Sequence, residues 1–307
     1  MVKYIPLGTA NVSNIILGNM RISDLDDEAI RSLVRAARDA GVTAFDHADI
    51  YGRSLHECET RFAEALELSS SEREHLFIQT KCGIVKDPPY YDSSYEHIIS
   101  SVEASLRALR TDYIDLLLLH RPDALVEPTE VARAFDQLRA SGKVRQFGVS
   151  NHTASQIEVL KSAVEQPLVA NQLQLSAAHA PLLAQGLSAN IKIDQANVVD
   201  GGGLLDYCRA NDITVQAWSP FQGNGHLIFD AAGFPDLSRE LELLAAKYDV
   251  EPIAVATAWI TRLPQPTMVV IGSTNPARVA DAAKGSELPL TRREWYSLYR
   301  AAGHILP

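Results

Sequence analysis

Short apolar runs alternate with amphipathic stretches about eight times along the chain. Each run carries apolar residues at nearly every position, which is typical of strands buried on both faces. The runs lie at residues 15–17, 43–45, 76–79, 113–119, 146–149, 168–170, 213–217 and 268–271. Between them, apolar positions recur three and four residues apart, which predicts helices at residues 26–40, 95–109, 131–140 and 238–247.

This alternation predicts a parallel sheet, because each return to a parallel neighbour needs a crossover, usually a helix. Eight such units close a (β/α)8 barrel, the TIM barrel, as a single domain over residues 1–307. An N-terminal segment (1–14) precedes it, and a C-terminal helix with a short tail (291–307) follows it. An open doubly wound sheet is the competing fold, but no G-x-G-x-x-G motif follows the first strand, where a dinucleotide-binding sheet carries one.

Two segments interrupt the alternation. Residues 188–200 are polar and fit neither a helix nor a strand. Residues 220–234 contain three glycines and predict a long loop after the seventh strand. Loops of that length in compact domains are often functional.

The composition, 46% hydrophobic and 21% charged over 307 residues, is that of an ordinary soluble globular protein. The chain has 28 Lys and Arg against 38 Asp and Glu, and this net charge of −10 argues against nucleic acid or an anionic membrane as the main partner. It leaves room for a local pocket that holds one phosphorylated cofactor. The scattered Cys58, Cys82 and Cys208 fit a reducing cytosol, and neither a disulfide framework nor a zinc site. Since no signal peptide or membrane-spanning apolar run is visible, we expect a cytoplasmic protein.

Polar residues follow nearly every predicted strand, at the end where barrel enzymes place their active sites. They are Asp46, Lys81, His120, Ser150, Asn151, Asn171, Gln172, Trp218 and Ser219. Each alone has a plain structural explanation, since a lysine after a strand is usually solvated and an aspartate can cap the next helix. The convergence of an acid, a tyrosine, a lysine and a histidine on three adjacent strand ends favours a catalytic mouth instead.

The quartet Asp46, Tyr51, Lys81 and His120 suits proton donation to a carbonyl oxygen. A tyrosine with a pKa near 10 is a poor acid at neutral pH unless a cation stabilises its phenolate. We expect Lys81 to lower the pKa of Tyr51 and Asp46 to hold Lys81 in place. His120 would then hydrogen-bond and orient the substrate carbonyl.

Six motifs between residues 15 and 282 resemble the aldo-keto reductase superfamily, in its order and at plausible spacing. They are Asp46-x4-Tyr51-Gly52, Thr80-Lys81, Leu-Leu-His120, Gly148-Val149-Ser150-Asn151, Asn171-Gln172 and Trp218-Ser219-Pro220. The strings DHADIYG, KCGI, HRPD and GKVRQFGVSN are similar to a bacterial branch of uncharacterised oxidoreductases in that family.

The resemblance implies a (β/α)8 barrel, NADP(H) as cofactor and the reversible reduction of a small aldehyde or ketone. It implies that Asp46, Tyr51, Lys81 and His120 are the catalytic tetrad, and that Ser150, Asn151 and Gln172 bind the nicotinamide amide. Trp218 matches the aromatic residue on which the nicotinamide stacks. The further cofactor-binding residues that it implies are Gly18, Asn19, Met20, Ser219, Pro220, Phe221, Gly272, Ser273, Thr274 and Arg278.

The chain departs from the family at the 2′-phosphate pocket. Gly272 stands where many members have a lysine, while Arg278 remains in the place of the phosphate-binding arginine. Ser273 and Thr274 can add bonds at the start of a helix predicted near residue 275, where the helix dipole favours an anion. We therefore expect NADPH to be preferred, but by less than in members that keep both cations. The alternative is that Arg278 only pairs with Asp281 on the helix surface.

Two other departures concern the substrate. Met20 occupies a rim position where an aromatic residue is frequent, and little chain follows the last predicted helix at residues 291–302. The substrate pocket is therefore expected to be shallow and open on that side. Its walls come from residues 121–129 and 221–234, and neither the substrate nor the oligomeric state follows from the sequence.

Two alternative functions compete with carbonyl reduction. One is a cofactor-binding sensor or regulatory barrel, which would have no need for Lys81 and Asp46 behind Tyr51. The other is a metal-dependent hydrolase that uses Asp46, His47, Asp49 and His120. Neither an HxH motif on the first strand nor a carboxylate on the eighth supports that reading, so we predict no metal.

Overall fold

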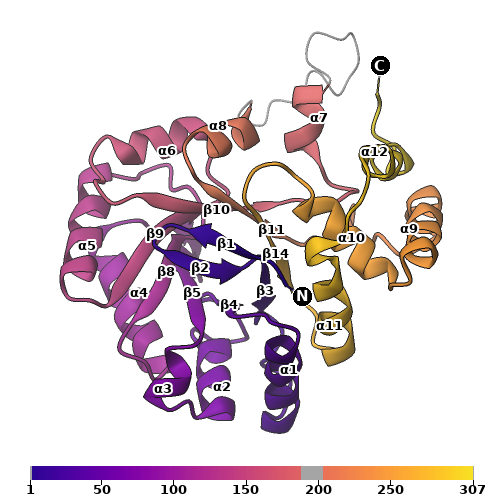
Figure 1. Ribbon diagram of the computed structural model, residues 1–307. Helices are drawn as coiled ribbons and strands as arrows, with labels where there is room; N and C mark the ends of the chain where they lie inside the picture. The colour runs from indigo at the N-terminus through magenta and orange to yellow at the C-terminus, as the bar shows by residue number, and fades with distance from the viewer. Residues whose placement is uncertain (1, 188–202, 307) are drawn as a thin grey trace.

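The computed structural model describes residues 2–187 and 203–306 (Figure 1), and the polar segment 188–200 lies outside the described residues. Eight strands form a closed barrel in which all neighbours pair in parallel. They are β3 (Ile15–Gly18), β4 (Ala44–Asp46), β5 (Phe77–Cys82), β8 (Ile114–Leu119), β9 (Val144–Ser150), β10 (Leu168–Gln174), β11 (Thr214–Trp218) and β14 (Thr267–Ile271). Each predicted apolar run overlaps one of these strands. The (β/α)8 barrel is confirmed, and the open sheet is excluded.

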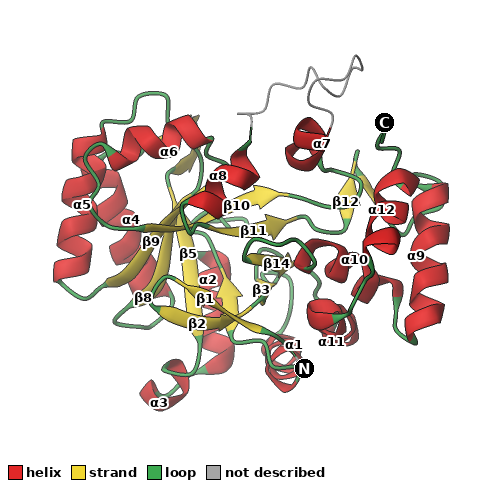
Figure 2. Ribbon diagram, turned by 45° about the horizontal axis from the view of Figure 1, so that its top comes forward, coloured by secondary structure: helices red, strands yellow, loops and turns green. Residues whose placement is uncertain are grey.

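Helices surround the barrel (Figure 2). In the described residues they are α1 (Asp27–Asp39), α2 (Glu57–Leu66), α3 (Ser70–Arg73), α4 (Tyr95–Ala108), α5 (Pro128–Ala140), α6 (Ala154–Lys161), α7 (Pro181–Leu187), α8 (Leu204–Ala210), α9 (Pro235–Tyr248), α10 (Pro252–Thr261), α11 (Pro276–Lys284) and α12 (Arg292–Ala301). The four helices predicted from periodicity are α1, α4, α5 and α9, with ends displaced by three residues or fewer. Within the described ranges, no helix is long and apolar enough to cross a membrane.

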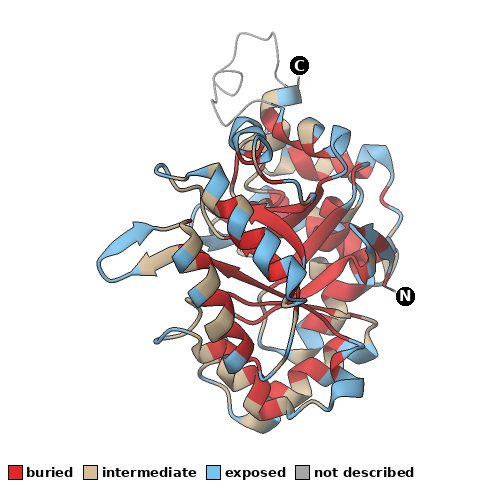
Figure 3. Ribbon diagram, turned by 90° about the vertical axis from the view of Figure 1, so that its left-hand side faces the viewer, coloured by how far each residue is buried: buried red, intermediate tan, exposed pale blue. Residues whose placement is uncertain are grey.

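Helix α1 shows why periodicity predicts these elements well. The Asp26 side chain accepts a hydrogen bond from the backbone N–H of Ala29 and so caps the helix N-terminus. The predicted stripe Ile30, Leu33, Val34 and Ala37 is buried against the barrel. Residues on the opposite side of such helices face solvent, while the barrel strands consist mostly of buried residues (Figure 3).

Helix α10 was not predicted, because seven of its residues are buried and no polar face marks a helical period. It anchors α12 through a pair of tryptophans. The rings of Trp259 and Trp295 stack with centroids 4.8 Å apart. Each indole Nε1 donates a hydrogen bond to the backbone carbonyl of the other tryptophan, at 3.1 and 2.8 Å. The C-terminal helix is therefore fixed to the barrel wall.

Three short antiparallel hairpins were also missed by the sequence analysis. They are β1 (Tyr4–Leu7) with β2 (Ala10–Ser13), β6 (Ile84–Lys86) with β7 (Pro89–Tyr91), and β12 (Gln222–Gly223) with β13 (His226–Leu227). The last lies inside the segment predicted as one long loop. Two- to four-residue strands are too short to show an alternating pattern.

The β1–β2 hairpin covers the N-terminal ends of the barrel strands. The Thr9 backbone N–H donates to Gln146 Oε1 at 2.8 Å, and Leu7 and Val12 belong to an apolar cluster with strand-start residues such as Phe77. Gly8 has a φ of +56°, and a Cβ there would lie 1.9 Å from Gln146 Oε1, so glycine permits this close approach. The barrel is thereby closed at the end opposite the predicted active site.

A buried ion pair fastens α3 to the barrel, and we expect its loss to destabilise the fold strongly. Arg73 donates to Asp115 at 2.8 Å, and Asp115 also accepts a bond from the Ile78 N–H. Arg73→Met leaves Asp115 with the half-exposed Arg145, at 3.0 Å, as its remaining cation, so the free energy of unfolding should fall by about 2–3 kcal/mol in urea titrations. Lys284→Ala is the matched control. It removes an exposed pair with Asp281 and should cost at most about 1 kcal/mol. Equal losses in the two variants would contradict this assignment.

Candidate active site

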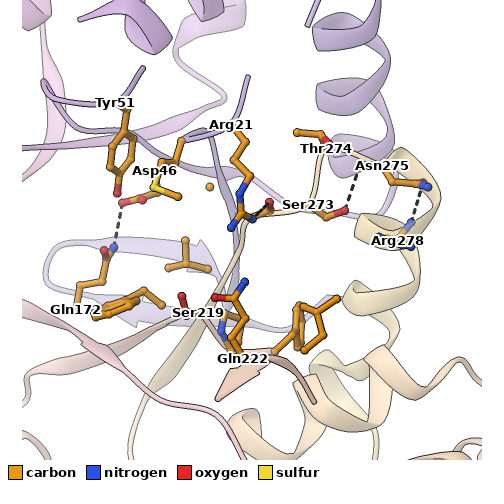
Figure 4. A pocket seen from close by; sticks show the side chains of 18 of the residues that line it. Arg21, Asp46, Tyr51, Gln172, Ser219, Gln222, Ser273, Thr274, Asn275 and Arg278 are labelled. Atoms are coloured by element: carbon orange, nitrogen blue, oxygen red, sulfur yellow. Dashed lines mark hydrogen bonds between the residues drawn. The ribbon is translucent and has the colours of Figure 1, made fainter. Parts of the chain in front are cut away.

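The four predicted catalytic residues meet at the C-terminal mouth of the barrel. Asp46 ends β4, Tyr51 lies in the loop that follows, Lys81 is in β5, and His120 comes directly after β8. Lys81 Nζ donates to the Asp46 carboxylate at 2.8 Å, to the Tyr51 hydroxyl at 2.9 Å and to the His47 carbonyl at 2.8 Å. All three donors of the ammonium group are therefore used. Figure 4 shows Asp46 and Tyr51 side by side in the pocket.

Lys81 carries its positive charge although it is completely buried. Burial alone would lower the pKa of this lysine, but the charge of Asp46 and the bonds to Asp46 and Tyr51 outweigh it and raise the pKa above its ordinary value. A protonated lysine at neutral pH follows. The pair Asp46–Lys81 is thus a fixed charge arrangement beneath the tyrosine hydroxyl.

The pKa of Tyr51 differs from the sequence-based expectation. Burial raises the pKa of the Tyr51 hydroxyl above its usual value, because a phenolate is poorly solvated there. Lys81 acts in the expected direction and lowers the pKa, but it offsets only part of this effect. The Tyr51 hydroxyl is therefore protonated, and the Lys81 cation is already placed to stabilise a phenolate at this position.

His120 lies at the other side of the tyrosine. The two ring centroids are 6.0 Å apart in an edge-to-face arrangement. Burial lowers the pKa of His120 well below its ordinary range, and the charges of Lys81 and Arg121 lower it further. His120 is therefore neutral at pH 7. Its Nδ1 is buried without a hydrogen-bond partner among the described residues, so Nε2 is the nitrogen that can serve the pocket.

A layer of buried glutamines supports Asp46 from inside the barrel. Gln79 and Gln172 each donate from Nε2 to Asp46 Oδ1, at 2.6 and 3.0 Å. Gln216 accepts from both and donates back to Gln79 Oε1 at 2.9 Å. The sequence analysis missed Gln79 and Gln216 as site residues. The available signal was an amide inside otherwise apolar strands, since buried polar groups need partners.

A single cavity of about 1500 Å³ extends from these residues towards the start of α11 (Figure 4). The predicted cofactor residues that line it are Gly18, Met20, Ser150, Asn151, Gln172, Trp218, Ser219, Pro220, Phe221, Gly272, Ser273, Thr274 and Arg278. Asn19 is the exception. It is fully buried, and its Nδ2 lies 3.0 Å from His47 Nε2, so its side chain points behind the strand ends rather than into the cavity.

The side chains around Trp218 are already bonded to one another. Trp218 Nε1 donates to Asn151 Oδ1 at 3.0 Å, and Asn151 Nδ2 donates to Ser150 Oγ at 2.8 Å. Ser150 Oγ in turn donates to the Gln172 carbonyl at 2.9 Å. This chain of bonds fixes the indole plane and the neighbouring polar groups, as a preorganised binding surface requires.

The far end of the cavity carries two arginines. Asn275 caps α11 by accepting from the N–H groups of Ala277 and Arg278 at 2.9 and 3.3 Å. Asp281 bonds to Lys284 at 2.7 Å, so the surface pairing considered for Arg278 is not what the structure shows. Arg278 takes part in no ion pair within the described part of the chain.

The second arginine, Arg21, escaped the sequence analysis. Its Nη1 donates to the Gly272 carbonyl at 2.9 Å, although 251 positions separate the two residues (Figure 4). A Cβ at position 272 would lie 3.3 Å from that nitrogen, so the glycine leaves Arg21 room. Arg21, from the loop after the first barrel strand, therefore places a cation beside Gly272, the position where many family members have a lysine.

The metal-site alternative finds no support in the arrangement of its residues. Asp46 is bonded to Lys81, and His47 Nε2 faces Asn19. Asp49 is buried, and burial raises its pKa to about 7, which disfavours a charged ligand. Over residues 2–187 and 203–306, no group of three or more His, Cys, Asp or Glu side chains is placed to hold a metal ion.

Comparisons with known proteins find similar sequences and similar structures. The sequence profile of the Aldo/keto reductase family matches residues 14–301. Oxidoreductase YdhF of Escherichia coli (strain K12) is 38% identical over 305 residues, which cover 96% of this chain and 95% of that protein. A 6-dehydroglucose reductase of Agrobacterium fabrum is 35% identical over 302 residues, covering 95% and 94%. The structure of an aldo-keto reductase from Klebsiella pneumoniae in complex with NADPH shares the fold, with a TM-score of 0.79, 23% identity and coverage of 100% and 96%.

Proposed function

Because the chain belongs to the aldo/keto reductase family, we propose that this oxidoreductase reduces the carbonyl of a small aldehyde or ketone to an alcohol with NADPH. The observation that carries the proposal is Lys81, which is completely buried and bonded at once to Asp46 and to the Tyr51 hydroxyl. A barrel that only sensed a cofactor would have no use for a buried charged pair behind a tyrosine.

Tyr51 is the proton donor in this proposal. Its O–H gives the proton to the carbonyl oxygen, and Lys81 stabilises the phenolate that remains. Asp46, held by the glutamine layer, keeps the ammonium group of Lys81 in position. Neutral His120 donates from Nε2 to the same carbonyl oxygen and orients it. Reduced nicotinamide, when bound, supplies the hydride.

The cavity fits a dinucleotide in its charges and its donors. Trp218 offers a fixed aromatic surface for the nicotinamide, with the bonded Ser150 and Asn151 beside it. At the other end, Arg21 and Arg278 are cations with no ion-pair partner in the described ranges, next to a capped helix N-terminus. Anionic groups are favoured at such a position. These residues would hold the phosphorylated end.

The reaction is tested by following NADPH oxidation with purified protein. Aromatic aldehydes, dicarbonyls, ketones and sugars form the substrate panel, and 6-dehydroglucose joins it because a relative is named for reducing it. Oxidation of NADPH with at least one carbonyl class, and formation of the corresponding alcohol, is the expected result. Tight NADPH binding without turnover on any carbonyl would instead favour the sensor barrel.

Cofactor choice gives a separate prediction. A 2′-phosphate distinguishes NADPH from NADH, and a guanidinium group binds phosphate through paired, charge-assisted bonds. Arg278→Ala and Arg21→Ala should each weaken NADPH binding by about 10-fold and leave NADH within about twofold. Dissociation constants from fluorescence titration measure both, with Arg292→Ala on α12 as the control. An arginine whose loss weakens both cofactors equally does not read the 2′-phosphate.

A further inference from the structure

The lining of the cavity has the opposite charge balance to the chain as a whole. The net charge of the chain is −10, yet four cations face the cavity without an ion-pair partner in the described residues. They are Arg21, Lys86, Arg121 and Arg278. Four acids line it, and cations neutralise three of them: Asp24 pairs with Arg53, Asp46 with Lys81 and Asp281 with Lys284. Only Glu251 is left without an ion pair among the described residues, so the unpaired cations outnumber the unpaired acids four to one. A positive pocket in an acidic protein indicates anionic ligands.

The four cations divide between the two ends of the cavity. Arg21 and Arg278 lie at the Gly272 end, where the phosphorylated part of the cofactor accounts for them. Lys86 and Arg121 lie at the catalytic end. Lys86 Nζ donates to the carbonyl of Gly52, the neighbour of Tyr51, at 3.0 Å. Arg121 directly follows His120, and its Cζ is 5.9 Å from the centre of the Trp218 ring. A nicotinamide ring offers no anion to these two.

We infer that this enzyme selects carbonyl substrates that carry an anionic group, a carboxylate or a phosphate, and that Arg121 is the residue that binds it, with Lys86 in support. The inference rests on the proposed function. A substrate whose carbonyl oxygen contacts Tyr51 and His120 also lies beside Arg121, the residue that follows His120. A guanidinium group binds carboxylate or phosphate through two parallel bonds, so it can fix orientation as well as charge.

Packing does not account for Arg121. A contact of 5.9 Å over a tryptophan ring is at the outer limit of cation–π attraction and stabilises little at a half-exposed site. Among the described residues, Arg121 makes no side-chain hydrogen bond or ion pair that would hold it for structural reasons. The guanidinium group of Arg121 is half-buried, has no carboxylate partner among the described residues and lies next to His120. It is therefore available to bind an anionic group of the substrate.

Matched substrates test the inference. The pairs are 4-carboxybenzaldehyde with its neutral methyl ester, and glyceraldehyde 3-phosphate with glyceraldehyde, so that carboxylate and phosphate are judged separately. The wild-type enzyme should have a higher kcat/KM for the anionic member of at least one pair. Arg121→Gln should lower kcat/KM for that member by about 10- to 100-fold and change the neutral member by less than about threefold. Arg121→Lys should restore part of the loss, because it keeps the charge but not the fork.

Two further measurements separate the explanations. Calorimetric titration with benzoate and with benzamide should show that Arg121→Gln weakens only the benzoate complex. The Kd of NADPH should stay unchanged in this variant, and a matched weakening of cofactor binding would overturn the inference by assigning Arg121 to the cofactor. Arg133→Gln, on exposed α5, makes the same change in net charge and should alter neither substrate.

The outcomes distinguish the two proposals. If neutral aldehydes are reduced as well as anionic ones, and Arg121→Gln affects both members of a pair equally, the substrate inference fails while carbonyl reduction stands. If no member of either pair and no other carbonyl compound supports the oxidation of NADPH, the proposed function and the inference fail together.

Discussion

Tyr51→Phe should lower kcat by at least about 10²-fold, because it removes the O–H that protonates the substrate oxygen in the proposed reaction. Phenylalanine keeps the ring and its edge-to-face contact with His120, so the shape of the pocket changes little. The Kd of NADPH should stay within about twofold, since an interaction made only during reaction affects turnover rather than binding. Steady-state kinetics and fluorescence titration measure the two quantities.

A tyrosine elsewhere provides the matched control. Tyr91 lies at the end of the exposed β6–β7 hairpin, and Tyr91→Phe removes the same chemical group there. This variant should keep the kcat of the wild-type enzyme. Thermal unfolding of both variants shows whether either change disturbs the fold. Retention of wild-type kcat by Tyr51→Phe would refute the assignment of the proton donor.

Lys81→Met should produce two losses at once. Turnover should fall by about 10²-fold or more, because no cation remains to stabilise the Tyr51 phenolate. The fold should also lose about 3–5 kcal/mol, because Asp46 is left as a buried carboxylate without its partner. Kinetics and urea titration on the same preparation give both values.

The double variant Asp46→Asn/Lys81→Met separates these effects. It removes both charges, so the free energy of unfolding should recover much of what the single variant lost. Activity should not recover, because the cation is still absent. Restored turnover in the double variant would mean that Lys81 serves the fold alone.

The barrel and the clustering of polar residues at one mouth could be predicted because their signals are local. A strand buried on both faces is a continuous apolar run, and a surface helix repeats its apolar positions, as Ile30, Leu33 and Val34 show. The polar residue at the end of each strand is then placed at one mouth by the topology alone. Asp46, Lys81 and His120 follow from this reasoning without further information.

Features that depend on side chains far apart in sequence could not be predicted. Arg21 reaches Gly272 across the cavity, and no linear pattern joins the two positions. Gln79 and Gln216 meet only because β5 and β11 face one another across the barrel interior. The pKa of Tyr51 depends on how deeply its hydroxyl is buried in the folded protein, and this burial raises the pKa by more than the nearby Lys81 lowers it.

The β1–β2 hairpin has a consequence for the timing of turnover. It closes the far end of the barrel, and Lys81 has no exposed surface, so in the described part of the chain these groups face bulk water at the mouth. Under the proposed mechanism, Tyr51 must regain a proton after each reaction, and the product stands in that path. Reprotonation therefore waits for product departure, and the two events occur in series. Slower product diffusion in viscous buffer should delay both together, so proton uptake followed with an indicator dye should keep pace with product release.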